Sequence, residues 1–158
     1  MLNSLIRFRR DRRGAAAIEF ALLVPLFMVF LLGVVEFGRV LAQSNAVEKG
    51  VRAGVALAVR SDNPMTAAQT TSVSNLVRYG NTTGTAPYLV DGWSDAGATV
   101  VIKNPPDTYT VPISGEVLTI VEITATVPYT PLVPGLFAFA GLSSFDIQVD
   151  HDQAYIGN

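Results

Sequence analysis

The chain has 158 residues, enough for one small folded domain and one membrane segment but not for two full domains and an anchor. Hydrophobic residues make up 49% and charged residues only 15%, against about 25% in a typical soluble domain, so the composition favours membrane insertion. Because cysteine is absent, the chain can form no disulfide, no cysteine-ligated zinc site and no thiol nucleophile.

The charged residues are unevenly distributed. Before position 14 lie one of the thirteen acidic residues and five of the eleven basic ones, namely Arg7, Arg9, Arg10, Arg12 and Arg13. Removal of residues 1–14 would leave six basic and twelve acidic residues, a net charge of −6. Because phosphate binding needs a retained basic patch, we expect no nucleic-acid partner.

Residues 15–35 form an apolar run in which Glu19 is the only charged side chain. As a helix this run would measure about 31 Å, close to the thickness of a bilayer core. Since basic flanks stay in the cytoplasm, we predict a basic cytoplasmic leader over residues 1–14, a transmembrane helix over residues 15–39 and an outward-facing remainder. Pro25 lies inside the run and is expected to kink the helix.

Two other export signals fit this N-terminus less well. A conventional secretory signal cleaved after Ala42 has a shorter apolar core, and Glu36 and Arg39 interrupt the stretch before that cut. A twin-arginine signal is suggested by Arg12 and Arg13, but the residues that follow lack the pattern expected after the pair. We consider both signals less consistent with the sequence than a signal that is cleaved near the start of the apolar run.

The position of Glu19 supports such a cut. A carboxylate inside a bilayer costs about 2.5–3.5 kcal/mol on insertion scales and usually has a partner. Cleavage between Gly14 and Ala15 would place a new amine one helical turn from Glu19, and the amine of one subunit could then pair with the carboxylate of its neighbour. The alternative is that Glu19 reaches the headgroups from an ordinary signal anchor.

Residues 12–25, with the sequence RRGAAAIEFALLVP, resemble the processing site and helix start of the TadE-like pseudopilins of the tight-adherence (Tad/Flp) pilus system. In that family a membrane aspartyl prepilin peptidase cuts after the glycine, and the glutamate is characteristic of the mature N-terminus. The resemblance implies that Gly14 and Ala15 flank the scissile bond and that Glu19 acts in assembly. Phe20 stands where many Tad prepilins carry tyrosine.

The likeness is strongest over residues 12–60 and weaker over residues 127–136. It implies a minor pilin or pseudopilin of the bacterial inner membrane, whose partners are the membrane, the prepilin peptidase and other pilin and Tad assembly subunits. An added domain of about 100 residues favours a minor component over the main fibre subunit. The alternative is an uncleaved single-pass envelope protein whose outer domain binds a ligand or partner; a secreted enzyme ranks last.

Beyond the membrane segment, apolar residues recur at helical spacing. The spacing predicts an amphipathic extension of the helix over residues 40–60, with an apolar stripe made of Val40, Val47, Val51, Val55 and Ala58. A second set of small residues would let another element approach closely, either the protein's own sheet or a second subunit: Gly50, Ala53, Gly54 and Ala58.

Residues 61–158 are predicted to form an extracytoplasmic domain, so the fold class is α+β, with a small antiparallel sheet packed on the long helix in a pilin-like arrangement. We expect a short helix over residues 66–79 with Thr66 as its N-cap, and strands over residues 98–103, 109–113, 116–127 and 144–155. Alternation in the longest strand predicts a core face made of Val117, Thr119, Val121, Ile123, Ala125 and Val127.

An apolar stretch over residues 134–142 is too short to span a membrane. We interpret it as a buried connection, and contact of Phe137 and Phe139 with the membrane surface or a neighbour is the alternative.

Residues that could carry catalysis are sparse. His151 is the only histidine, and strand alternation would direct it away from Asp150 and Asp152, which favours a structural strand over a metal site. No nucleophile elbow or phosphate-binding loop is present in the sequence. We therefore expect no enzymatic activity, catalytic residue, metal, cofactor or small-molecule substrate.

Overall fold

The computed structural model describes residues 12–133, 135 and 144–156. In chain order its elements are helix α2 (Arg12–Ala58), helix α3 (Ala67–Tyr79), the 3-10 helix η1 (Asp91–Ser94) and the strands β1 (Thr99–Ile102), β2 (Asp107–Thr110), β3 (Val117–Tyr129) and β4 (Phe145–Ala154). The chain divides into two compact units between Gly38 and Arg39, so that α2 contributes to both. The expected α+β class, a long N-terminal helix with a small antiparallel sheet, is confirmed.

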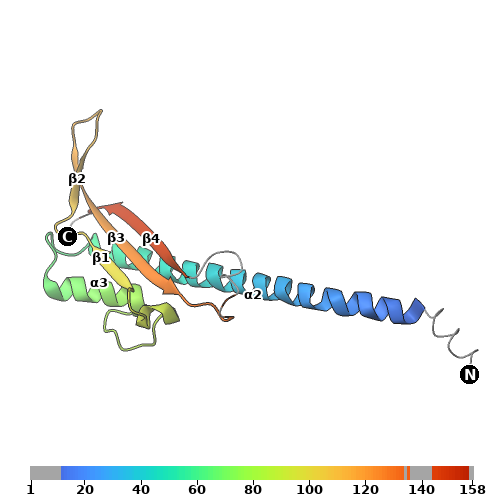
Figure 1. The fold of residues 1–158 in the computed structure, drawn as a ribbon. Coiled ribbons are helices and arrows are strands. Elements are labelled where there is room, and N and C mark those ends of the chain that lie inside the picture. Colours follow the sequence, from blue (N-terminus) through green and yellow to red (C-terminus); the bar gives the residue numbers. More distant parts are fainter. Residues whose placement is uncertain (1–11, 134, 136–143, 157–158) are drawn as a thin grey trace, which may run out of the picture. The chain divides into compact units, whose positions relative to one another are not determined.

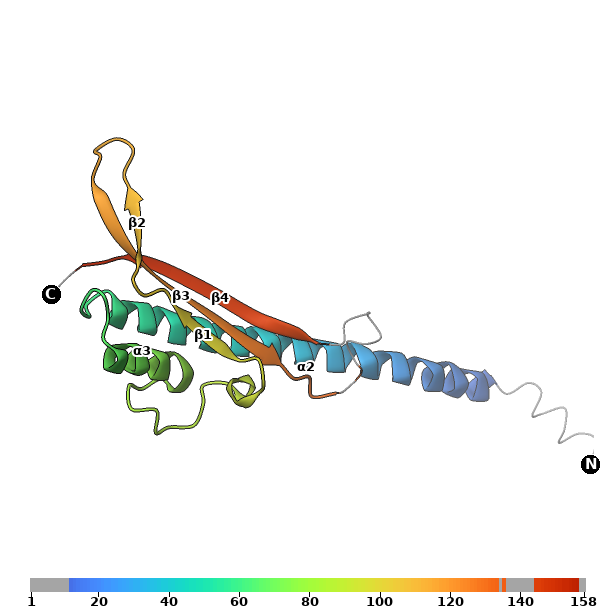
Figure 2. The same ribbon diagram turned by 60° about the vertical axis from the view of Figure 1, so that its left-hand side comes forward.

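The sheet is built around the long strand β3 (Figures 1 and 2). Strand β4 runs antiparallel along one edge of β3, from the Ile120–Ala154 pair to the Tyr129–Phe145 pair. Strands β1 and β2 share the opposite edge, where β1 pairs with residues 123–126 and β2 with residues 117–120. The two short strands are therefore successive segments along one edge, separated by a turn over residues 103–106.

The core of the second unit lies between the sheet and residues 39–58 of α2. Val47, Val51 and Val55 are fully buried and lie four residues apart, so they form one stripe on the helix. They belong to one hydrophobic cluster with five residues of β3, namely Val121, Ile123, Ala125, Val127 and Tyr129. A fully buried aliphatic side chain of this size contributes about 1.5–3 kcal/mol, so this stripe is a main source of the unit's stability.

The predicted core face of the long strand is correct from Val121 onward and wrong at its start. Alternate residues of β3 are buried from Val121 to Tyr129, whereas Val117 is 61% exposed. The pairing with β4 ends at Ile120, and the remainder of β3 continues with β2 alone. Alternation identifies which residues share a face, but not how far the covering helix extends along that face.

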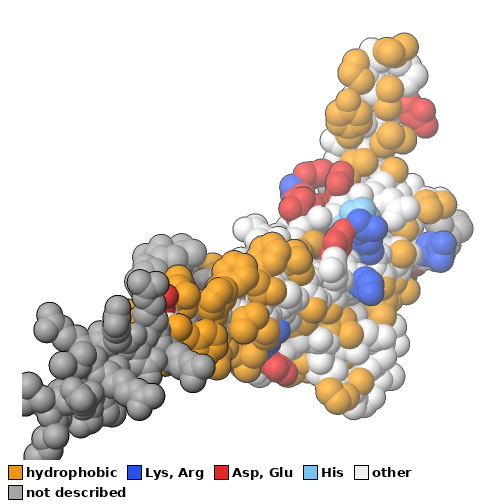
Figure 3. Space-filling view, turned by 90° about the vertical axis from the view of Figure 1, so that its right-hand side faces the viewer, with side chains coloured by type: hydrophobic (Ala, Val, Ile, Leu, Met, Phe, Trp, Pro, Cys, Tyr) orange, Lys and Arg blue, Asp and Glu red, His pale blue; other side chains and the backbone are white. Residues whose placement is uncertain are grey.

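Strand β2 and the start of β3 form a hairpin that projects from the rest of the sheet (Figures 1 and 2). All four residues of β2 are exposed, and Ile113 in the turn is 99% exposed. Figure 3 shows hydrophobic side chains along this hairpin. The hairpin is held by its own backbone hydrogen bonds rather than by the core.

Helix α3 begins as the sequence predicts. Thr66 is the N-cap: its side chain accepts a hydrogen bond from the Gln69 backbone N–H, and the Gln69 side chain accepts one from the Thr66 backbone N–H at 2.9 Å. This capping box satisfies two N–H groups that the first turn of a helix leaves without partners. The helix ends at Gly80, which has a φ of 72°, a conformation that favours glycine.

Two glycines of α2 let α3 approach closely. A Cβ added to Gly50 would lie 2.5 Å from the Val77 carbonyl oxygen, and one added to Gly54 would lie 2.6 Å from Val77 Cγ2. The sequence left two partners open for this small-residue surface, the protein's own sheet and a second subunit. In the structure the two glycines pack against elements of the same chain. The close neighbour is helix α3 as much as the sheet, whose Ile123 Cδ1 would lie 3.4 Å from the added Cβ at Gly54.

Candidate functional site

The N-terminal part of α2 is apolar and uncovered. Apart from the half-buried Val24, its large hydrophobic side chains from Ile18 to Val35 are between 41% and 73% exposed. Within the described part of the chain, α2 is the helix that is long and apolar enough to cross a membrane, and none of its most apolar window, with a mean hydropathy of 2.6, is buried. A helix that is apolar on all sides needs an apolar environment, which lipid or neighbouring helices supply.

Gly14 and Ala15 lie near the start of α2 and are exposed. A Cβ added to Gly14 would meet no atom within 4 Å, and the backbone φ of Gly14 is not positive. Glycine inside a helix costs about 0.5–1 kcal/mol relative to alanine, so the described chain gains nothing from glycine here. A requirement for glycine at this position would therefore come from a partner molecule and not from the fold.

Glu19 lies one helical turn after Ala15, on the same side of α2, and is exposed. Within the described residues its carboxylate makes no hydrogen bond and no ion pair. In hydrocarbon an isolated carboxylate costs about 2.5–3.5 kcal/mol, so in that environment Glu19 would gain from a cation that another group supplies.

The remaining predicted features of this segment are only partly visible. Arg9 and Arg10 lie outside the described residues, and Arg12 and Arg13 form the start of α2. Pro25 is exposed, and α2 continues through it as one helix. The roles of the leader arginines and the kink at Pro25 stay predictions.

A cluster that the sequence analysis missed marks the start of the second unit. The Arg39 guanidinium carbon lies 5.8 Å from the centroid of the Tyr129 ring, and Tyr129 stacks on Phe145 with ring centroids 4.9 Å apart. The cluster ties the helix to the end of β3 and the start of β4. The available signal was Tyr129 itself, which continues the core face of β3 two residues beyond Val127 and is 3% exposed.

Glu36 is a second residue to which the sequence analysis gave no role. Its side chain is only 2% exposed, although the apolar side chains of Val34, Val35 and Phe37 beside it are exposed. Carboxylates are rarely buried to this degree without a structural or functional reason. The connection over residues 134–142, with Phe137 and Phe139, lies outside the described residues apart from Gly135, so its predicted burial is not tested.

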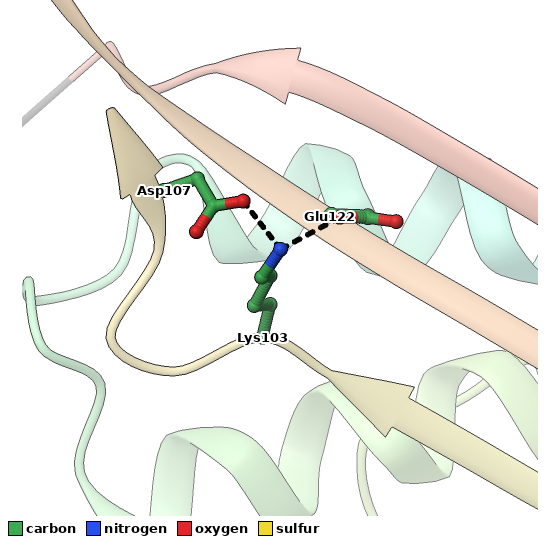
Figure 4. A network of polar contacts seen from close by, with 3 residues as sticks. All are labelled: Lys103, Asp107 and Glu122. Carbon is green, nitrogen blue, oxygen red and sulfur yellow. Dashed lines mark hydrogen bonds and ion pairs between the residues drawn. The ribbon is translucent and has the colours of Figure 1, made fainter. Parts of the chain in front are cut away.

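The outer face of the sheet carries charged side chains. Lys103, just after β1, contacts the carboxylates of Asp107 on β2 and Glu122 on β3, the second at 3.5 Å (Figure 4). The hydrogen bond from Lys103 to Asp107, and then the charges of both carboxylates, raise the pKa of the lysine above its usual value. The contact joins the two short edge strands to the central one.

The described residues show no cluster of His, Asp and Glu that could hold a metal ion. His151 pairs with Ile123 on the inner side of the sheet, and Asp150 and Asp152 are exposed on the other side. An open groove of about 270 Å³ lies between α2 and α3, and its lining contains one charged side chain, that of Lys49. This lining lacks the acid and base pair that general acid–base catalysis would use.

Comparison with known proteins finds a similarity, which covers the N-terminal helix. The family model described as TadE-like protein matches residues 14–56. No curated protein and no solved structure matches the chain. The matched segment starts at Gly14 and contains Glu19 and the buried valine stripe, and the resemblance seen in the sequence is confirmed over this range. The uncovered part of the helix that is long and apolar enough to cross a membrane therefore lies within the TadE-like segment.

Proposed function

Because residues 14–56 are TadE-like, we propose that this chain is a minor pilin or pseudopilin of a Tad/Flp-type pilus, with a structural and not an enzymatic role. The observation that carries the proposal is the order and spacing of three features within the matched segment. Gly14 has no role in the fold, Glu19 follows five residues later, and the apolar residues from Ile18 to Val35 are uncovered. An anchor that only tethers a domain would need the third feature alone.

In this proposal the chain inserts with residues 1–14 in the cytoplasm, residues 15–39 across the inner membrane and residues 40–158 outside. A prepilin peptidase cuts between Gly14 and Ala15, and the new amine becomes the first group of the mature subunit. The Glu19 carboxylate of one subunit then pairs with the amine of a neighbour, which removes two isolated charges from the apolar region at once. The pairing fixes the axial position of one helix against the next.

A deletion strain tests the function directly. Pili are sheared from wild-type cells, from cells that lack this chain, and from deleted cells that carry the chain on a plasmid, and the main pilus subunit is quantified in each. We expect the deletion to lower surface pili at least tenfold and the plasmid to restore them. Normal pili in the deleted cells would overturn the proposal and leave the uncleaved envelope protein as the alternative.

A further inference from the structure

The second unit carries opposite charges on two opposite faces. The outer face of the sheet holds five carboxylates, since residues paired across strands share a face: Asp107, Glu122, Asp146, Asp150 and Asp152. Lys103 is the basic side chain that contacts this face, where it binds Asp107 and Glu122. Asp146, Asp150 and Asp152 on β4 are exposed and make no ion pair within the described residues.

The helical layer on the other side of the core is basic. Residues 42–60 present an exposed side, away from the buried valines, that contains Ala42, Asn45, Lys49, Arg52, Ala53, Ala56 and Arg60. Arg52 forms an ion pair with Glu48, which is half-buried beside this side. Lys49 and Arg60 make no ion pair within the described residues, so the side has a net positive charge.

The two faces also match in size and shape. Lys49 lies on α2 and Arg60 lies two residues beyond its end, eleven residues away, which is about 16 Å at the rise of a helix; Asp146 and Asp152 are six residues apart on β4, which is about 20 Å. Ala42, Ala53 and Ala56 keep the helical face low, and Thr99, Thr124 and Thr126 keep the sheet face flat between the acids. Val101, which pairs with Thr124 and is 59% exposed, is an apolar side chain on the same sheet face that a docked helix would cover.

We propose that the basic helical face of one copy docks on the acidic sheet face of a second copy. The two faces lie on opposite sides of one core, so the contact is head-to-tail and each added copy exposes a fresh face of the same kind. The charge complementarity sets the orientation and the partner more than the affinity. The inference rests on the proposed function, because assembly of the N-terminal helices is what brings two such domains together.

The absence of cysteine makes a cross-linking test clean. The full-length chain is expressed in the pilus-bearing strain as Ala53→Cys, as Gln148→Cys and as the double variant; both positions are exposed, one on each face. After oxidation of intact cells, we expect the double variant to give a ladder of dimers and larger species at least tenfold stronger than either single variant. A dimer from Ala53→Cys alone, or from Gln148→Cys alone, that is as abundant as the dimer of the double variant would indicate a symmetric contact and overturn the proposal.

Charge-reversal variants test whether the two faces are held together by their opposite charges. In the double-cysteine background, Asp150→Lys with Asp152→Lys should weaken the ladder at least tenfold, and added Lys49→Glu with Arg60→Glu should restore it. Loss without restoration, at an unchanged thermal midpoint of the purified protein, would refute the charge pairing. The N-terminal mass of the same samples separates the two proposals: a mature chain that gives no ladder overturns this interface alone, whereas a ladder from an uncut chain overturns the processing.

Discussion

Gly54 lies directly against Val77: a Cβ added to Gly54 would lie 2.6 Å from Val77 Cγ2, and one added to Gly50 would lie 2.5 Å from the Val77 carbonyl oxygen. Gly54→Ala and Gly50→Ala should each destabilise the second unit by about 1–3 kcal/mol, because overpacking outweighs the gain in helix propensity. Gly50→Ala should cost more, since it meets backbone. Thermal unfolding of the full chain in detergent measures both.

Gly33→Ala is the matched control for these two variants, because a Cβ there would meet no atom within 4 Å. We expect its thermal midpoint to equal or exceed that of the wild type. Equal midpoints for Gly33→Ala and Gly54→Ala would show that helices α2 and α3 do not pack as closely as described.

The capping box of α3 predicts a second stability effect. Thr66→Ala removes the side-chain acceptor for the Gln69 N–H and should lower the free energy of unfolding by about 1 kcal/mol. Thr71→Ala, in the same helix, removes only a side-chain hydrogen bond to the Ala67 carbonyl and should be nearly neutral. Urea unfolding compares the two; a larger loss for Thr71→Ala would contradict the assignment of the helix start.

The contact of Lys103 predicts that the stability of the chain changes with pH in one defined direction. The pKa of Lys103 is raised in the folded chain, first by the hydrogen bond to Asp107, so the stabilisation is fully present below the unfolded pKa and is lost as pH rises through the folded pKa. The difference in urea midpoint between wild type and Lys103→Met should be constant from neutral pH to about pH 10 and shrink above it. A difference that grows above pH 10 would have the wrong sign.

Lys49→Met is the control for that measurement, because Lys49 makes no ion pair within the described residues. For Lys49→Met, the difference in urea midpoint from the wild type should not shrink above about pH 10. The Lys103 contact is exposed, so the effect is expected to be small.

A variant of Glu19 distinguishes insertion into the membrane from assembly into pili. Glu19→Gln removes a charge from the apolar segment, so membrane levels should be unchanged or higher, while the amount of chain recovered with sheared pili should fall at least tenfold. Immunoblots of membranes and of pili from the same cells measure both quantities. Wild-type recovery of Glu19→Gln with pili would exclude a role for the carboxylate in pairing with an amine.

Local patterns in the sequence predicted the elements well, and long-range packing less well. The N-cap at Thr66 and the buried face from Val121 to Val127 follow from short motifs and from alternation, which depend only on neighbouring residues. The exposure of Val117 depends on where β4 and the helical layer end, and the burial of Glu36 departs from the exposure of its apolar neighbours in the sequence. Neither spacing nor composition carries that information.

The candidate site shows the same division. The apolar segment, Gly14 and Glu19 are read from the sequence, and the family match covers all three. The Arg39–Tyr129–Phe145 cluster joins three elements that lie far apart in the sequence, and the opposite charges of the two domain faces appear only once the strand register is known. Both features required the tertiary fold.

The central claim, that the chain is a processed pilin-like subunit, is tested most directly by the mass of its N-terminus. Chains are isolated from membranes of cells with and without the prepilin peptidase, as wild type and as Gly14→Ala, which leaves the fold intact because the added Cβ meets no atom. We predict a mature chain that starts at Ala15 only for the wild type in the presence of the peptidase. A membrane-bound chain that retains Met1, or one that starts at Gln43, would contradict the account.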